Sequence, residues 1–158
     1  MSEIHLLLIL HLLGATIWVG GHILLCVIIL PQVWKEQAVE KLFAFESRYE
    51  WIGMPALLVM LITGVRMAYL YNVKIANWFA FETPIERVIS LKLSLLIGIV
   101  ILALSAQFYV LPRLKTDIKK LPLMAFHMIT VTLISLAMLI LGSFVRYGDC
   151  IITYFVSS

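Results

Sequence analysis

Four long apolar runs dominate this sequence and constrain its fold more than any other feature. The hydrocarbon core of a bilayer is about 30 Å thick, and a helix needs about 20 apolar residues to cross it. Each run reaches that length, and short connections between the runs make neighbouring helices antiparallel. We therefore expect an all-α integral membrane protein, an up-down four-transmembrane-helix bundle forming one domain over residues 1–158. The expected spans are about 3–30, 51–71, 88–111 and 123–145.

Composition agrees with this class and excludes several others. The chain is 63% hydrophobic and only 13% charged, whereas soluble domains are about half apolar and a quarter charged. Nothing resembles a phosphate-binding loop or a nucleic-acid-binding patch, and Cys26 and Cys150 are too few for a disulfide framework. The start lacks the basic region of a signal peptide, so the first run should be a retained span. No internal repeat is evident, and Pro55 is expected in the first turns of the second helix.

The distribution of lysine and arginine predicts the orientation. Cytoplasmic loops carry an excess of these residues, and here the first and third connections hold seven against three on the other side. We expect both termini outside, in a multi-pass protein of the bacterial inner membrane. The seven are Lys35, Lys41, Arg48, Arg113, Lys115, Lys119 and Lys120, and the three are Lys74, Arg87 and Arg146.

A polar stripe interrupts the first apolar run. On a helix, His11, Trp18 and His22 fall within about 20° of one another, with Gly14 and Gly21 beside them. Such a stripe suits a face turned inward against a flat ligand or another helix. The two histidines are about 16 Å apart along the axis, so they would serve two sites at different depths.

Counting from the centre of each span sorts the polar residues within the membrane into two layers. His22 and His127 lie about 7–10 Å to the inner side, whereas His11, Lys92 and Arg66 lie about 7–10 Å to the outer side. Ionisable groups at such depths are costly, so each is a functional candidate.

The inner layer has the composition of a bis-histidine site for haem b. His22 and His127 lie on helices that should be neighbours, and haem iron takes imidazole from both sides. Gly21 would let the flat ring approach the first helix. The structural alternative is that both histidines are buried and hydrogen-bonded to serine or to a carbonyl group.

The outer layer would hold a second haem. His11 would be one iron ligand, and the other would be Lys92 in its neutral form, or there would be no strong sixth ligand. Arg66 and Arg146 would then be available for the propionates. In the structural alternative, Lys92 extends to the outer interface and Arg66 pairs with Glu86 or Glu82.

Copper is the competing metal. Cys26 follows His22 by one turn, and Met54, Met124 and Met128 lie on the inner side of their spans. Thiolate, thioether and imidazole are the ligands that copper(I) favours. Methionines scattered through apolar helices are, however, commonly packing residues.

Several stretches of the chain resemble the membrane domain of the copper-resistance protein D family. They are His11 with Trp18 and Gly21, the segment FESRYEWIGMPALLVMLITG, and Lys92 within ISLKLSLL. That family in turn is similar to the J-type protoporphyrinogen oxidases, in which a first-helix histidine and a third-helix lysine are linked to haem b binding and activity. The resemblance implies these roles for His11 and Lys92. The chain differs from these enzymes in two segments, which read ILPQVW and FHMITV. Both differences favour a protein similar to the copper-resistance protein D family.

Three functions follow from these patterns. The leading hypothesis is a haem b protein that transfers electrons, with one or two haems in the bundle and a redox partner or quinone. The second is a copper-binding or copper-transfer membrane protein, and the third is an oxidase acting on a porphyrinogen or quinone. The patterns identify no catalytic residue, and a homodimer is compatible with them.

Overall fold

The computed structural model describes residues 2–147, with the side chains of the last three of these left out. Cys150 and the side chain of Arg146 lie outside the described part. Within it, the chain is helical and contains no strand. The longer elements are α1 (Glu3–Leu24), η1 (Leu25–Ile29), α2 (Leu30–Glu36), α3 (Val39–Leu70), α4 (Pro84–Ser105), η3 (Ala106–Val110), α5 (Leu111–Leu114) and α6 (Leu121–Tyr147). The short 3₁₀ turns are η2 (Ile75–Asn77) and η4 (Ile118–Lys120).

Four helical rods are long and apolar enough to cross a membrane. They are Glu3–Glu36, Val39–Leu70, Pro84–Leu114 and Ile118–Phe144. The prediction of an all-α, four-helix membrane bundle is therefore confirmed. Large apolar side chains remain on the outside, among them Trp51 and Phe108, which are 84% and 77% exposed. Such surfaces suit a lipid environment, in which the backbone hydrogen bonds are satisfied within each helix.

Pro55 lies well inside α3, so its expected position near a helix start is wrong. The helix begins at Val39, because the polar stretch before Trp51 continues the helix instead of forming a loop. An interior proline removes one backbone hydrogen bond. The lack of that bond does not interrupt the helix, which runs without a break to Leu70.

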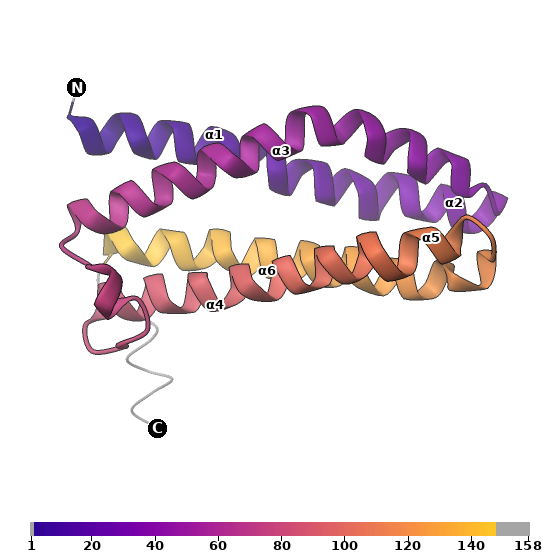
Figure 1. The fold of residues 1–158 in the computed structure, drawn as a ribbon. Helices are drawn as coiled ribbons and strands as arrows, with labels where there is room; N and C mark the ends of the chain where they lie inside the picture. The colour runs from indigo at the N-terminus through magenta and orange to yellow at the C-terminus, as the bar shows by residue number, and fades with distance from the viewer. Residues whose placement is uncertain (1, 148–158) are drawn as a thin grey trace.

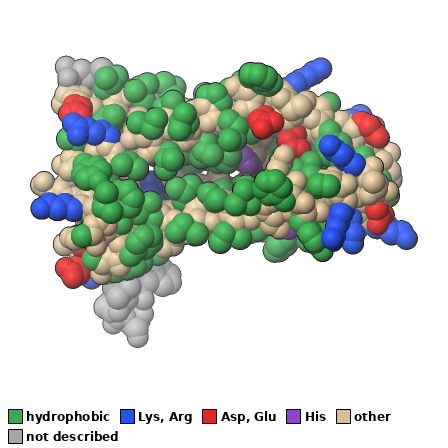
Figure 2. All heavy atoms as spheres, in the orientation of Figure 1, with side chains coloured by type: hydrophobic (Ala, Val, Ile, Leu, Met, Phe, Trp, Pro, Cys, Tyr) green, Lys and Arg blue, Asp and Glu red, His purple; other side chains and the backbone are tan. Residues whose placement is uncertain are grey.

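The bundle consists of two helical hairpins. Helix α1 packs along α3, and α4 packs along α6. The hairpins meet mainly where α1 and η1 contact α6, whereas α3 and α4 hardly touch along their described lengths (Figure 1). A space-filling view shows a hollow between the hairpins, with basic and histidine side chains visible in its depth (Figure 2).

The two hairpins follow the same plan, although no repeat was evident in the sequence. Each begins with a 22-residue α-helix, α1 or α4. Each then has a five-residue π-helical segment, followed by a Leu-Pro pair at Pro31 or Pro112. His11 and Lys92 are each the ninth residue of their helix. The structural repeat therefore places a histidine and a lysine at equivalent positions.

Buried side chains concentrate at the end of the bundle opposite the start of α1. The core there joins α2, α3, α5 and the start of α6, and Val33 and Val110 are fully buried in it. This core holds the two hairpins together at one end. It comprises Leu30, Val33, Leu42, Val110, Leu111, Leu114, Leu121, Met124, Ala125 and Met128.

Candidate functional site

Two of the histidines within the membrane are held by their own helices. Nδ1 of His22 lies 2.8 Å from the carbonyl oxygen of Trp18, and Nδ1 of His127 lies 2.8 Å from that of Leu123. A carbonyl oxygen only accepts hydrogen bonds, so each Nδ1 carries a proton and donates it. In the neutral ring, the lone pair is therefore on Nε2.

His11 has the same tautomer for a different reason. Its Nδ1 lies 3.0 Å from Oγ1 of Thr63 on α3, and that hydroxyl donates to the carbonyl of Val59 at 2.6 Å. Since the hydroxyl proton is already engaged, Thr63 accepts from His11. Hydrogen bonds of this kind fix the orientation of histidines that bind metals through the other nitrogen.

The Nε2 atoms differ in what they contact. Nε2 of His127 lies 3.1 Å from the hydroxyl of Ser105, which can donate to it. His127 therefore has the arrangement that the structural alternative describes, with one bond to a carbonyl and one to a serine. No hydrogen bond to Nε2 of His11 or His22 occurs in the described part of the chain.

His22 and His127 contact different helices. The His22 ring lies 4.5 Å from that of Trp18 and 5.9 Å from that of Tyr49 on α3. His127 instead meets Ser105, where α4 ends. The structure thus brings His22 to an aromatic cluster with Trp18 and Tyr49, whereas His127 lies against the end of α4.

The glycines of the first-run stripe serve helix packing. A Cβ on Gly21 would overlap the ring of Tyr49, and one on Gly14 would lie 2.9 Å from the carbonyl oxygen of Ala56. The hydroxyl of Tyr49 donates to the carbonyl of Trp18 at 2.8 Å. Both glycines therefore allow α3 to approach α1, which is the second of the two alternatives, a flat ligand or another helix, that the stripe predicted.

His11 and Lys92 each pack against a glycine of a neighbouring helix. A Cβ on Gly64 would lie 3.2 Å from Cε1 of His11, and one on Gly142 would lie 3.0 Å from Nζ of Lys92. Each polar side chain thus rests against a glycine on the second helix of its own hairpin.

Arg66 does not join this pair. Its Nε donates to Oε1 of Glu3 at 2.7 Å, and both side chains are about half exposed. The partner is thus a glutamate at the start of α1, not one after α3. The sequence could not indicate this, because the pairing depends on how α3 crosses α1.

A sulfur-rich seam joins η1 to α6. Sγ of Cys26 lies 3.1 Å from Oγ1 of Thr132, and that hydroxyl donates to the carbonyl of Met128 at 2.7 Å. Met124, Met128 and Thr132 follow one another at four-residue spacing, so they share a face of α6. Both methionines are buried in the core against which Cys26 packs. We call Cys26, Met124 and Met128 the sulfur seam.

Other arrangements of metal ligands are sparse. No group of three His, Cys, Asp or Glu side chains gathers anywhere in the described residues. Met54, the remaining sulfur candidate, is 53% exposed on α3. Cys26 thus contacts the face of α6 that carries two buried methionines, and thioether and thiolate sulfur are ligands that select copper(I).

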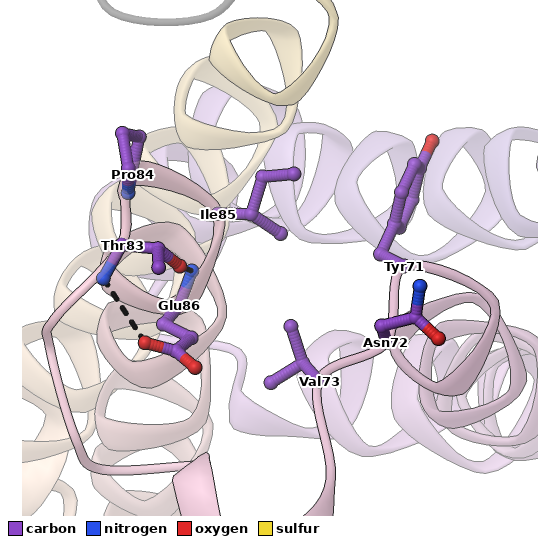
Figure 3. A pocket seen from close by; sticks show the side chains of 7 residues that line it. All are labelled: Tyr71, Asn72, Val73, Thr83, Pro84, Ile85 and Glu86. Carbon is purple, nitrogen blue, oxygen red and sulfur yellow. Dashed lines mark hydrogen bonds between the residues drawn. The ribbon is translucent and has the colours of Figure 1, made fainter.

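A cavity of about 500 Å³ lies between the end of α3 and the start of α4 (Figure 3). The Glu86 carboxylate in it accepts hydrogen bonds from the backbone nitrogen of Thr83 at 3.0 Å and from Nδ2 of Asn77 at 2.8 Å. The Thr83 hydroxyl in turn accepts from the backbone nitrogen of Glu86 at 3.2 Å, which completes a capping box. Thr83 and Glu86 therefore cap the start of α4, and the hydrogen bonds of their side chains are internal.

Comparison with known proteins gives one family. The profile described as copper resistance protein D matches residues 43–145. The match contains Lys92, Met124 and Met128 and begins after the elements that carry His11 and Cys26. No curated protein and no solved structure matches the chain.

Proposed function

The chain belongs to the copper resistance protein D family, and from that premise we propose that it binds copper(I) as cargo within the membrane, at the sulfur seam. The observation that carries this proposal is the contact of Cys26 with Thr132, which places the thiol beside the face of α6 that holds two buried methionines. Copper(I) favours a small set of soft ligands in an apolar setting.

The local hydrogen bonds support a metal site. Because the Thr132 hydroxyl donates to the Met128 carbonyl, the Cys26 thiol is the donor in its contact with Thr132. Binding of copper(I) would release that thiol proton, since thiolate is the metal ligand. Cys26 also lies in the π-helical segment η1, and such segments are frequent at functional sites.

Copper fits these residues better than haem b does. The inner haem depended on His22 facing His127, and the two rings contact different helices. The nitrogen of His127 that would bind iron is within hydrogen-bond distance of Ser105.

Copper(I) titration of the purified protein under anaerobic conditions tests the proposal. The protein should withdraw copper(I) from its coloured bicinchoninate complex. Cys26→Ser and Met128→Leu should each weaken this binding by about tenfold or more, which is about 1.4 kcal/mol. Leucine conserves the volume of methionine, so the core should remain packed.

Met54→Leu is the matched control, because Met54 is exposed on α3 and lies away from the seam. Equal copper binding by the wild type, Cys26→Ser and Met128→Leu would contradict the proposal. A Soret band with reducible α bands in the purified protein, lost in His22→Ala and kept in Cys26→Ser, would favour the haem b hypothesis instead.

A further inference from the structure

The connection between α5 and α6 carries the surplus positive charge of this chain. Residues 113–120 hold four basic side chains and one acidic one, a net charge of +3, which is also the net charge of the whole chain. Residues 35–50, at the same end of the bundle, hold three basic and four acidic side chains. Figure 2 shows lysine and arginine side chains gathered at this end. The surplus is therefore concentrated in one short connection.

The backbone of this connection folds back on itself. The carbonyl oxygen of Arg113 accepts from the backbone nitrogen of Asp117 at 2.8 Å, and Oδ1 of Asp117 accepts from the backbone nitrogen of Lys119 at 3.0 Å. The backbone nitrogen of Lys120 donates to the Asp117 carbonyl at 3.1 Å. Helix α5, which carries Arg113, also contacts η4, which carries both lysines. These contacts hold Arg113, Lys119 and Lys120 together in one compact segment.

The charges of these three residues are not compensated within the described chain. The ion pairs of that part join Lys41 to Glu36 and Arg66 to Glu3, so none of the three takes part in one. The carboxylate nearest in sequence is that of Asp117, and it caps a backbone nitrogen. The basic segment is thus available to an anion from outside the chain.

The other carboxylates at this end lie on α3 and have a different basic neighbour. Lys115 extends toward that helix, since its Nζ lies 5.6 Å from the centre of the Phe43 ring. Lys115 therefore belongs with the α3 side of this end, and the uncompensated charges are those of the other three basic residues. The carboxylates on α3 are Glu40, Glu46 and Glu50.

Arg113 is oriented in a way that suits a phosphate group. Its Cζ lies 3.6 Å from the centre of the Tyr109 ring, which is a cation–π contact. Stacking of this kind uses the face of the planar guanidinium, whereas the N–H groups lie in its plane. Those groups can hold two oxygens of one phosphate at once. Tyr109 therefore positions Arg113 without occupying its donors.

The apolar surroundings indicate that the phosphate belongs to a lipid. Tyr109 is 51% exposed, and Phe108 beside it in the chain is 77% exposed. Both belong to η3, in the last part of a rod that is long and apolar enough to cross a membrane. Tyrosine is enriched at the border between hydrocarbon and headgroups, and the charged ends of arginine and lysine extend to it. The basic segment thus lies at the level of the lipid phosphates.

We propose that Arg113, Lys119 and Lys120 bind the phosphate group of an anionic phospholipid, whose acyl chains lie along the exposed side chains of η3. Basic clusters next to a transmembrane helix attract anionic lipids in this way. A zwitterionic phospholipid also has a phosphate, but its own ammonium group offsets that charge. The site does not depend on copper(I) binding or on which side of the membrane this end faces.

Native mass spectrometry of the purified protein with added lipid tests the proposal. Phosphatidylglycerol should bind about fivefold or more tightly than phosphatidylcholine with the same acyl chains, and added salt should reduce the difference. The double variant Arg113→Gln/Lys119→Gln should lose this preference. Both side chains are exposed, so the fold should be retained, and thermal unfolding in detergent checks it.

The matched control is Lys35→Gln/Arg48→Gln, which removes the same charge from residues 35–50 and should keep the preference. Equal binding of the two lipids by the wild type would overturn the proposal, as would an undiminished preference in the folded Arg113→Gln/Lys119→Gln variant or an equal loss in both double variants. Displacement of phosphatidylglycerol by inorganic phosphate at equal concentration would also overturn it, because the site would then serve free phosphate. If Arg113→Gln/Lys119→Gln does not fold, the comparison of the two lipids on the wild type decides.

Discussion

The ring of Tyr49 on α3 lies directly against Gly21 on α1, where a Cβ would overlap it. The Tyr49 hydroxyl donates to the Trp18 carbonyl at 2.8 Å, the same oxygen that accepts from Nδ1 of His22. One carbonyl thus orients both a tyrosine and a histidine. This contact sets how α3 crosses α1 and directs His22 toward α3.

Gly21→Ala should destabilise the bundle by about 1–3 kcal/mol, because the added methyl group would force Tyr49 or α3 to move. The measurement is thermal unfolding in detergent. Gly20→Ala is the matched control, since a Cβ on Gly20 would meet no atom within 4 Å. Similar unfolding temperatures for the two variants would show that Tyr49 does not pack on Gly21 as described.

The pair formed by Arg66 and Glu3 should contribute little, because both side chains are about half exposed and salt screens such pairs. A double-mutant cycle of Arg66→Met and Glu3→Gln should give a weak coupling that decreases further as salt is added. Neither change should alter copper(I) binding. A loss of copper(I) binding in Arg66→Met would instead return Arg66 to the functional site.

The excess of lysine and arginine at the end of the bundle that contains α2 and α5 predicts that this end is cytoplasmic. Cysteine accessibility in intact cells measures the orientation, in a Cys150→Ser background. Lys115→Cys should resist a membrane-impermeant thiol reagent, whereas Lys74→Cys, at the opposite end, should be labelled. The reverse pattern would invert the orientation and leave the bundle unchanged.

The sequence by itself determined the membrane class, the four-helix architecture and the membership in the copper-resistance family. These follow from local properties, namely the length of each apolar run relative to the bilayer and the residue patterns within the runs. The relation to the J-type oxidases stays a prediction. The position of each span was less well determined, because a polar segment such as the one before Trp51 can extend a helix beyond the membrane.

Depth along each helix could also be estimated from the sequence, and His11 and Lys92 were assigned to one layer on that ground. The structure packs each of them against a glycine on the second helix of its own hairpin. His22 and His127 were also assigned to one layer, and their rings contact different helices. The depth of a residue follows from its position along the helix, which the sequence gives. The neighbour that its side chain meets depends on how the helices rotate and cross.

Only the tertiary structure decided which faces meet. The contact of Cys26 with Thr132 joins residues that are far apart in the chain, and it follows from how η1 packs on α6. The sequence also gave no sign that the two hairpins are similar. Side chains that face lipid need only be apolar, so they can differ while the helices keep the same order and lengths. Contacts between helices depend on close packing, which no single run of residues specifies.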